Sequence, residues 1–194
     1  MLPIRIAILA SGSGSNAENI FNYFSQREDI QISLIISNRE EAYVHQRAKR
    51  LGVPSLFMSK PELSDTDSVL SVFRKYKIDF VVLAGYLLRI PDGLIKAYPN
   101  RIINIHPALL PKFGGKGMYG EKVHLAVVEA GERESGITIH YVNENYDEGN
   151  VIFQVKCPVL ESDSPDEVAL KVHELEYKYF PSVIDQVIRR EFGI

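Results

Sequence analysis

The sequence has one cysteine, no long apolar run and no excess of basic residues, and each absence excludes a class of protein. Cys157 has no second cysteine to pair with, so an intramolecular disulfide is excluded and a reducing, cytoplasmic setting is expected. The formal net charge of −3 argues against a nucleic-acid partner, which needs a clustered basic face. The apolar start, Ile4–Ala10, is interrupted by Arg5 and is too short for a membrane span, so we expect a soluble protein without a signal peptide.

What is present is an ordinary globular composition. The 194 residues are 45% hydrophobic and 24% charged, which excludes a disordered chain. No repeat, low-complexity tract or linker divides the sequence. We therefore expect residues 1–194 to form a single domain.

Short β-branched runs alternate with segments of helical period. The expected strands are Ile4–Ala10, Ile32–Ser37, Ser55–Phe57, Phe80–Leu83, Arg101–Ile105, Gly136–Val142 and Val151–Leu160. The expected helices are Ser15–Gln26, Glu41–Leu51, Thr66–Tyr76, Pro91–Ala97 and Pro165–Phe192, the last kinked or split at Pro181. This alternation predicts an α/β fold, with a mostly parallel twisted sheet, helices on both faces and late strands that are partly antiparallel.

The loop after the first expected strand reads Ser-Gly-Ser-Gly-Ser-Asn and leads into a helix. Glycine lets the backbone approach a ligand, and a helix start offers free N–H groups, so a phosphate held by Gly14, Ser15 and Asn16 is expected. The spacing also fits a dinucleotide site, but the second strand ends in Asn38-Arg39 without the acid that would bind a ribose. An NADP site using Arg39, and a plain tight turn, remain the alternatives.

Asn104 and His106 interrupt the apolar run of the fifth expected strand. Side chains two apart on a strand share a face, and Pro107 ends the strand where they emerge. An amide can donate to an oxygen that gains negative charge, and an imidazole can move a proton near neutral pH. The pair is therefore a candidate catalytic edge, although a buried, satisfied pair would have the same pattern.

Asp147, in an acidic loop between the last two expected strands, strengthens the catalytic interpretation. A carboxylate beside His106 is expected to raise the pKa of that imidazole and make it a better general acid. No serine or cysteine stands in a nucleophile setting. His45, His124, His140 and His173 have no metal-ligand spacing. We therefore expect proton transfer and oxyanion stabilisation without a metal.

Four motifs occur in order: Ser11–Asn16, Leu83–Tyr86, Asn104–Pro111 and Asp147–Asn150. Together they make the sequence resemble the folate-dependent phosphoribosylglycinamide (glycinamide ribonucleotide) formyltransferase family over essentially the whole chain. The resemblance implies a Rossmann-like formyltransferase fold in its single-domain form. It also implies transfer of the formyl group of 10-formyltetrahydrofolate to the amine of 5′-phosphoribosylglycinamide, a step of purine biosynthesis.

The resemblance also implies residue roles. Asn104, His106 and Asp147 would be catalytic, with Asp147 keeping His106 charged, and Glu176 would contact the ribonucleotide whose phosphate Gly14–Asn16 hold. The residues implied around the folate pterin are Tyr86, Leu87, Leu88, Arg89, Ile90, Asn104 and Asn143. The partners would be these two small molecules, and the protein a monomer or homodimer.

Rival functions stay open at this point. A formyltetrahydrofolate deformylase would transfer the formyl group to water. That enzyme resembles this chain but carries an additional N-terminal regulatory domain, which we do not expect here. A methionyl-tRNA formyltransferase has a C-terminal domain and a basic surface, neither of which we expect here. An NADP-dependent oxidoreductase would use Arg39, and a phosphate-ligand sensor would bind without turnover.

Overall fold

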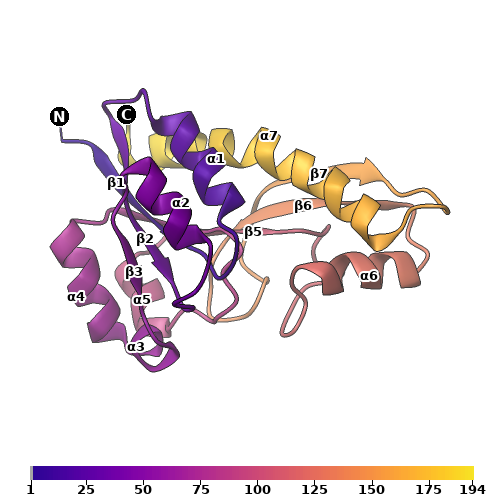
Figure 1. Cartoon of the computed structure of the whole chain (residues 1–194), viewed down its shortest axis with the longest axis horizontal. Helices are drawn as coiled ribbons and strands as arrows, with labels where there is room; N and C mark the ends of the chain where they lie inside the picture. The colour runs from indigo at the N-terminus through magenta and orange to yellow at the C-terminus, as the bar shows by residue number, and fades with distance from the viewer. Residues whose placement is uncertain (1) are drawn as a thin grey trace. The chain divides into compact units, whose positions relative to one another are not determined.

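The computed structural model describes residues 2–194 and divides into two compact units (Figure 1). The first unit ends at Ile103 and the second runs Asn104–Ile194. Strand β5 (Ile102–His106) begins in the first unit and ends in the second. The expectation of one domain over residues 1–194 stays a prediction.

The first unit is built on parallel strands. These are β1 (Ile4–Leu9), β2 (Ile30–Ser37), β3 (Ser55–Phe57) and β4 (Phe80–Leu83), in the order β3-β2-β1-β4. Every residue of β4 and the last four of β1 are buried. Because alternate residues of a strand point to opposite faces, this part of the sheet is covered on both faces, as predicted.

The helices of the first unit follow its strands in βα alternation. They are α1 (Ser15–Phe24), α2 (Val44–Leu51), α3 (Lys60–Ser64), α4 (Thr66–Tyr76) and α5 (Asp92–Ala97). The sequence analysis missed α3. It is a five-residue helix opened by a capping box, in which Ser59 and Glu62 satisfy each other's backbone N–H groups.

The second unit is antiparallel where the first is parallel. Strand β6 (Glu134–Tyr141) pairs antiparallel with β7 (Val151–Pro158), and the local strand order is β5-β6-β7. The mixed α/β sheet and the antiparallel late strands were both predicted. The helices of this unit are α6 (Glu121–Glu129) and α7 (Pro165–Phe192).

Helix α7 continues through a proline. It opens with a capping box between Ser164 and Glu167 and runs past Pro181 without ending. The expected split at Pro181 was therefore wrong, and the alternative, a kink there, stays a prediction. The helix buries an apolar stripe on both sides of the proline, including Val172 before it and Ile184 after it. That packing holds the two halves in one helix despite the missing N–H group.

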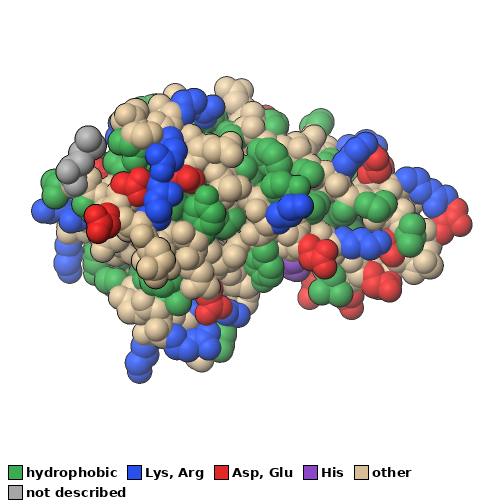
Figure 2. Space-filling view, turned by 90° about the horizontal axis from the view of Figure 1, so that it is seen from above, with side chains coloured by type: hydrophobic (Ala, Val, Ile, Leu, Met, Phe, Trp, Pro, Cys, Tyr) green, Lys and Arg blue, Asp and Glu red, His purple; other side chains and the backbone are tan. Residues whose placement is uncertain are grey.

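The surface carries charges of both signs. Figure 2 shows lysine and arginine side chains interspersed with acidic and hydrophobic ones on the face in view. No helix within residues 2–194 has both the length and the apolar character needed to cross a membrane.

Candidate active site

The polar end of β5 is placed as the sequence predicted. Ile103 and Ile105 are buried and anchor the strand, while Asn104 is half-buried and His106 is 3% exposed. The strand ends at His106, directly before Pro107. The amide and the imidazole therefore emerge together at a strand end inside the second unit.

The turn after β6 brings Asp147 to this strand end. Asp147 has a left-handed backbone, with φ of 57°. Gly149, two residues later, packs so closely that a Cβ there would lie 1.6 Å from the Tyr141 carbonyl oxygen. Only glycine fits at that position, which explains the Asp-x-Gly spacing in physical terms.

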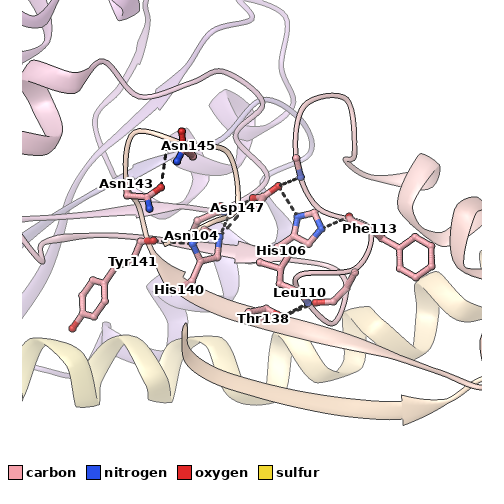
Figure 3. A network of polar contacts seen from close by, with 12 residues as sticks. Asn104, His106, Leu110, Phe113, Thr138, His140, Tyr141, Asn143, Asn145 and Asp147 are labelled. Atoms are coloured by element: carbon pink, nitrogen blue, oxygen red, sulfur yellow. Dashed lines mark hydrogen bonds and ion pairs between the residues drawn. The ribbon is translucent and has the colours of Figure 1, made fainter. Parts of the chain in front are cut away.

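His106 has an oxygen beside each ring nitrogen (Figure 3). Its Nε2 lies 2.7 Å from the Phe113 carbonyl oxygen, which can only accept, so Nε2 carries a proton. Its Nδ1 lies 3.5 Å from Asp147 Oδ2, which also accepts a hydrogen bond from the Gly115 N–H at 3.0 Å. Asp147 therefore faces the nitrogen that a second proton would occupy.

His140, on β6, completes the cluster and was missed as a functional residue. Its Nε2 lies 3.1 Å from Asn104 Nδ2 and 3.6 Å from Asp147 Oδ1, and its Nδ1 lies 2.8 Å from the Tyr141 carbonyl oxygen. Asn104 Nδ2 also donates to Asp147 Oδ1 at 3.4 Å. The available signal was Thr138 and His140, two polar residues two apart in an apolar strand.

The pKa of His106 corrects a prediction. Burial lowers the pKa of this imidazole, and the attraction of Asp147 and the hydrogen bond to Phe113 offset that effect only in part. The net pKa lies below the ordinary value, whereas a raised pKa had been expected from Asp147 alone. Desolvation has a larger effect on the pKa than the charge of Asp147, because the His106 side chain is almost fully enclosed.

Asp147 is ionised at neutral pH. Burial raises the pKa of this carboxyl, but the contact with His140, the charge of His106 and the Gly115 N–H together hold its pKa below the usual range. The cluster thus pairs an ionised carboxylate with an imidazole whose pKa is lowered by burial. A negative charge close to that imidazole would favour its protonated form.

Comparisons with known proteins fit this arrangement. Residues 4–184 match the model of the Formyl transferase family. The chain belongs to the formyl transferase family.

Two curated relatives of this formyl transferase chain carry the same name. A phosphoribosylglycinamide formyltransferase of Bacillus subtilis (strain 168) is 34% identical over 190 residues, covering 95% of this chain and 94% of the relative. The chloroplastic one of Arabidopsis thaliana is 42% identical over 189 residues, covering 94% of this chain. The chain spans 65% of that plant relative, just under two thirds of its length.

A solved structure confirms the fold class. The phosphoribosylglycinamide formyltransferase of Streptococcus pneumoniae TIGR4 has a TM-score of 0.84 and 35% sequence identity, covering 95% of this chain and 99% of that one. The mixed sheet of this formyl transferase chain is therefore one already seen in crystals of similar proteins.

The predicted phosphate loop of the formyl transferase chain lies in the first unit. Gly14 caps α1 with φ of 74°, and a Cβ there would lie 2.3 Å from Val44 Cγ2. Ser15 opens α1 and Asn16 follows, so both stand in the first turn, where helix N–H groups point outward. Helix α2 contacts this loop, because the N–H of its first residue, Val44, donates a hydrogen bond to the Gly12 carbonyl oxygen.

The predicted pterin residues are more varied in exposure. Tyr86, Leu87 and Leu88 are half-buried, Arg89 is exposed and paired with Asp92, and Ile90 is only 3% exposed. In the second unit, Asn143 Oδ1 accepts a hydrogen bond from the Asn145 N–H at 3.0 Å and closes the turn that carries Asp147.

Glu176 is a buried acid in a histidine cluster of the second unit. It is 4% exposed, and its Oε2 lies 2.8 Å from His173 Nδ1. This hydrogen bond raises the pKa of His173, whereas burial, with the charge of His173, lowers the pKa of His124. Carboxylate oxygens accept hydrogen bonds, so a hydroxyl or an amine is the kind of group that Glu176 could bind.

A separate hollow of about 750 Å³ lies at the amino-terminal ends of β1 and β2, lined among others by Arg5, Phe24, Arg27 and Tyr76. None of the predicted site residues lines it. Ligands of parallel sheets bind at the carboxyl ends of strands, which is the opposite end of β1 and β2 from this hollow.

Proposed function

We propose that the protein transfers the formyl group of 10-formyltetrahydrofolate to the amine of 5′-phosphoribosylglycinamide. The observation that carries the proposal is the cluster of Asn104, His106, His140 and Asp147, with both histidines buried, in a chain of the formyl transferase family. The name shared by the relatives supports the choice of substrate.

The ligand roles follow the sequence prediction. Gly14, Ser15 and Asn16 bind the phosphate of the ribonucleotide through the amino-terminal turn of α1. Glu176 accepts a hydrogen bond from the ribonucleotide. The segment 86–90 and Asn143 bind the pterin, with backbone groups making the polar contacts.

In the reaction, the glycyl amine attacks the formyl carbon. A new bond forms between that nitrogen and the carbon, and the bond from the carbon to the folate nitrogen breaks. The amine loses a proton, and the folate nitrogen gains one. Asn104 and the protonated form of His106 stabilise the oxyanion of the intermediate, and His106 delivers the proton to the leaving nitrogen.

The hydrogen bonds of Asn104 define what must change when a substrate binds. Both hydrogens of the Asn104 amide nitrogen have partners, His140 and Asp147. Asn104 can donate to the formyl oxygen only by releasing one of them. Asp147 attracts the proton that His106 takes up as negative charge develops, which acts against the lowering of the His106 pKa by burial.

The test is a steady-state assay of the purified protein with 10-formyltetrahydrofolate, with and without phosphoribosylglycinamide, followed by folate absorbance. We expect turnover only when the amine is present. Turnover without the amine would identify a deformylase, and none with both substrates would overturn the proposal.

The use of metal, the oligomeric state and the location of the protein are also matters of proposal. We infer that the protein works on small molecules without a metal, as a monomer or homodimer. A cytoplasmic location is proposed from the single cysteine, although the Arabidopsis relative is chloroplastic by name.

A further inference from the structure

One buried serine connects three loops of the first unit. Ser11 follows β1, Asn38 follows β2, and Gly85 and Leu87 follow β4. Strand β1 pairs with both β2 and β4, so the residues after these strands meet at one edge of the parallel sheet. Ser11 is 1% exposed at that meeting point.

The hydroxyl of Ser11 acts as both a hydrogen-bond donor and a hydrogen-bond acceptor. It donates to Asn38 Oδ1 at 2.6 Å and accepts a hydrogen bond from the Leu87 N–H at 3.0 Å. The Ser11 N–H adds a third bond, to the Gly85 carbonyl oxygen, at 3.0 Å. Two of these three bonds depend on the side chain and would be lost with alanine.

The residues that Ser11 holds lead directly into the two ligand loops. Gly12 is the next residue, and Gly14 opens the helix that binds the phosphate. Leu87 is itself part of the segment 86–90 assigned to the pterin. The same contact explains the end of β2, because the Asn38 side chain is engaged by Ser11 where a dinucleotide site would present an acid to the ribose.

We propose that Ser11 is a positioning residue that fixes the phosphate loop and the pterin loop relative to each other. The inference rests on the proposed function for the identity of the two ligands. Since backbone groups of the segment 86–90 make the pterin contacts, anchoring the Leu87 N–H sets their direction. Loss of the Ser11 hydrogen bonds therefore weakens the binding of both substrates.

The main test is Ser11→Ala with Ser33→Ala as the matched control. Ser33 lies on β2, and its Oγ is buried without a hydrogen-bond partner among the described residues, so the same atom is removed there without breaking a bond. For Ser11→Ala we expect KM to rise about tenfold for each substrate, and kcat to stay within about threefold. Ser33→Ala should match the wild type in both constants.

Hydrogen exchange provides a readout that does not depend on turnover. The peptide containing residues 84–90 should exchange faster in Ser11→Ala than in the wild type or in Ser33→Ala. Asn38→Ala removes only one of the side-chain bonds and should raise both KM values by about threefold. If Ser11→Ala does not fold, the Asn38→Ala variant tests the same proposal.

Each outcome decides a different claim. A folded Ser11→Ala protein with unchanged exchange, or with only one KM altered, would overturn the shared anchor. A wild-type protein that transfers no formyl group would overturn the proposed function, whereas the exchange measurement would still show whether Ser11 holds the segment 84–90.

Discussion

At the scale of single residues, the proposed chemistry depends on the pKa of His106, on which burial and the charge of Asp147 have opposite effects. His106 is enclosed, which favours the neutral ring, while Asp147 beside its Nδ1 favours the charged one. Burial is the larger effect, so the pKa of His106 lies below its ordinary value. In the proposed reaction, His106 takes up a proton when negative charge develops on the substrate.

This balance predicts the titration of His106. By NMR, its pKa in the wild type should lie below the ordinary value of about 6.5, and Asp147→Asn should lower it further because the attraction of the carboxylate is removed. The unfolded chain then binds the proton more readily than the folded one, so His106 makes the free energy of unfolding fall as pH drops below about 6.5. A pKa that rises in Asp147→Asn would contradict this account.

Part of the site was predictable from the sequence at this scale. The placement of Asn104 and His106 together at a strand end was predicted, because a polar pair two apart in an apolar strand is visible without a structure. The contacts of His140 and of the Phe113 carbonyl were not found, since they depend on pairing between strands and on the path of a loop. For the same reason burial was underestimated, and the pKa of His106 was predicted in the wrong direction.

At the scale of elements, tight turns place the reactive side chains. The turn between β6 and β7 carries Asp147 in a left-handed conformation, and Gly149 lets it lie against the backbone of Tyr141. The aspartate is therefore held by the geometry of the turn as well as by its own hydrogen bonds.

Substitution of this glycine tests the placement. Gly149→Ala puts a Cβ 1.6 Å from the Tyr141 carbonyl oxygen, so the turn must shift, and we expect a loss of about 2 kcal/mol or more in the free energy of unfolding. In Gly12→Ala the new Cβ meets no atom within 4 Å, and the loss should be below about 0.5 kcal/mol. Urea unfolding of both variants provides the measurement, and equal losses would show that the turn adapts freely.

The elements themselves were largely predictable. Hydrophobic period gave Ser55–Phe57, Thr66–Tyr76, Phe80–Leu83 and Pro165–Phe192 with their observed bounds. The short α3 was missed because five residues are too few for a periodic signal. The continuity of α7 was missed because the packing on both sides of Pro181 cannot be read from local propensity.

At the scale of the whole molecule, a common fold carries a specific set of side chains. The parallel first unit contains the proposed phosphate loop at the start of α1, and the second unit contains the polar cluster around Asp147. Membership of the formyl transferase family follows from the match over residues 4–184. The fold alone does not select a reaction, so the proposed reaction rests on the side chains at the strand ends.

The central claim is that this cluster transfers a formyl group. The most direct measurement is kcat of Asp147→Asn with 10-formyltetrahydrofolate and phosphoribosylglycinamide, alongside ribonucleotide affinity from calorimetry. We expect kcat to fall by about 100-fold or more, with the affinity unchanged, because proton transfer through His106 is lost while the phosphate loop is intact. A folded Asp147→Asn protein that turns over at the wild-type rate would contradict the account.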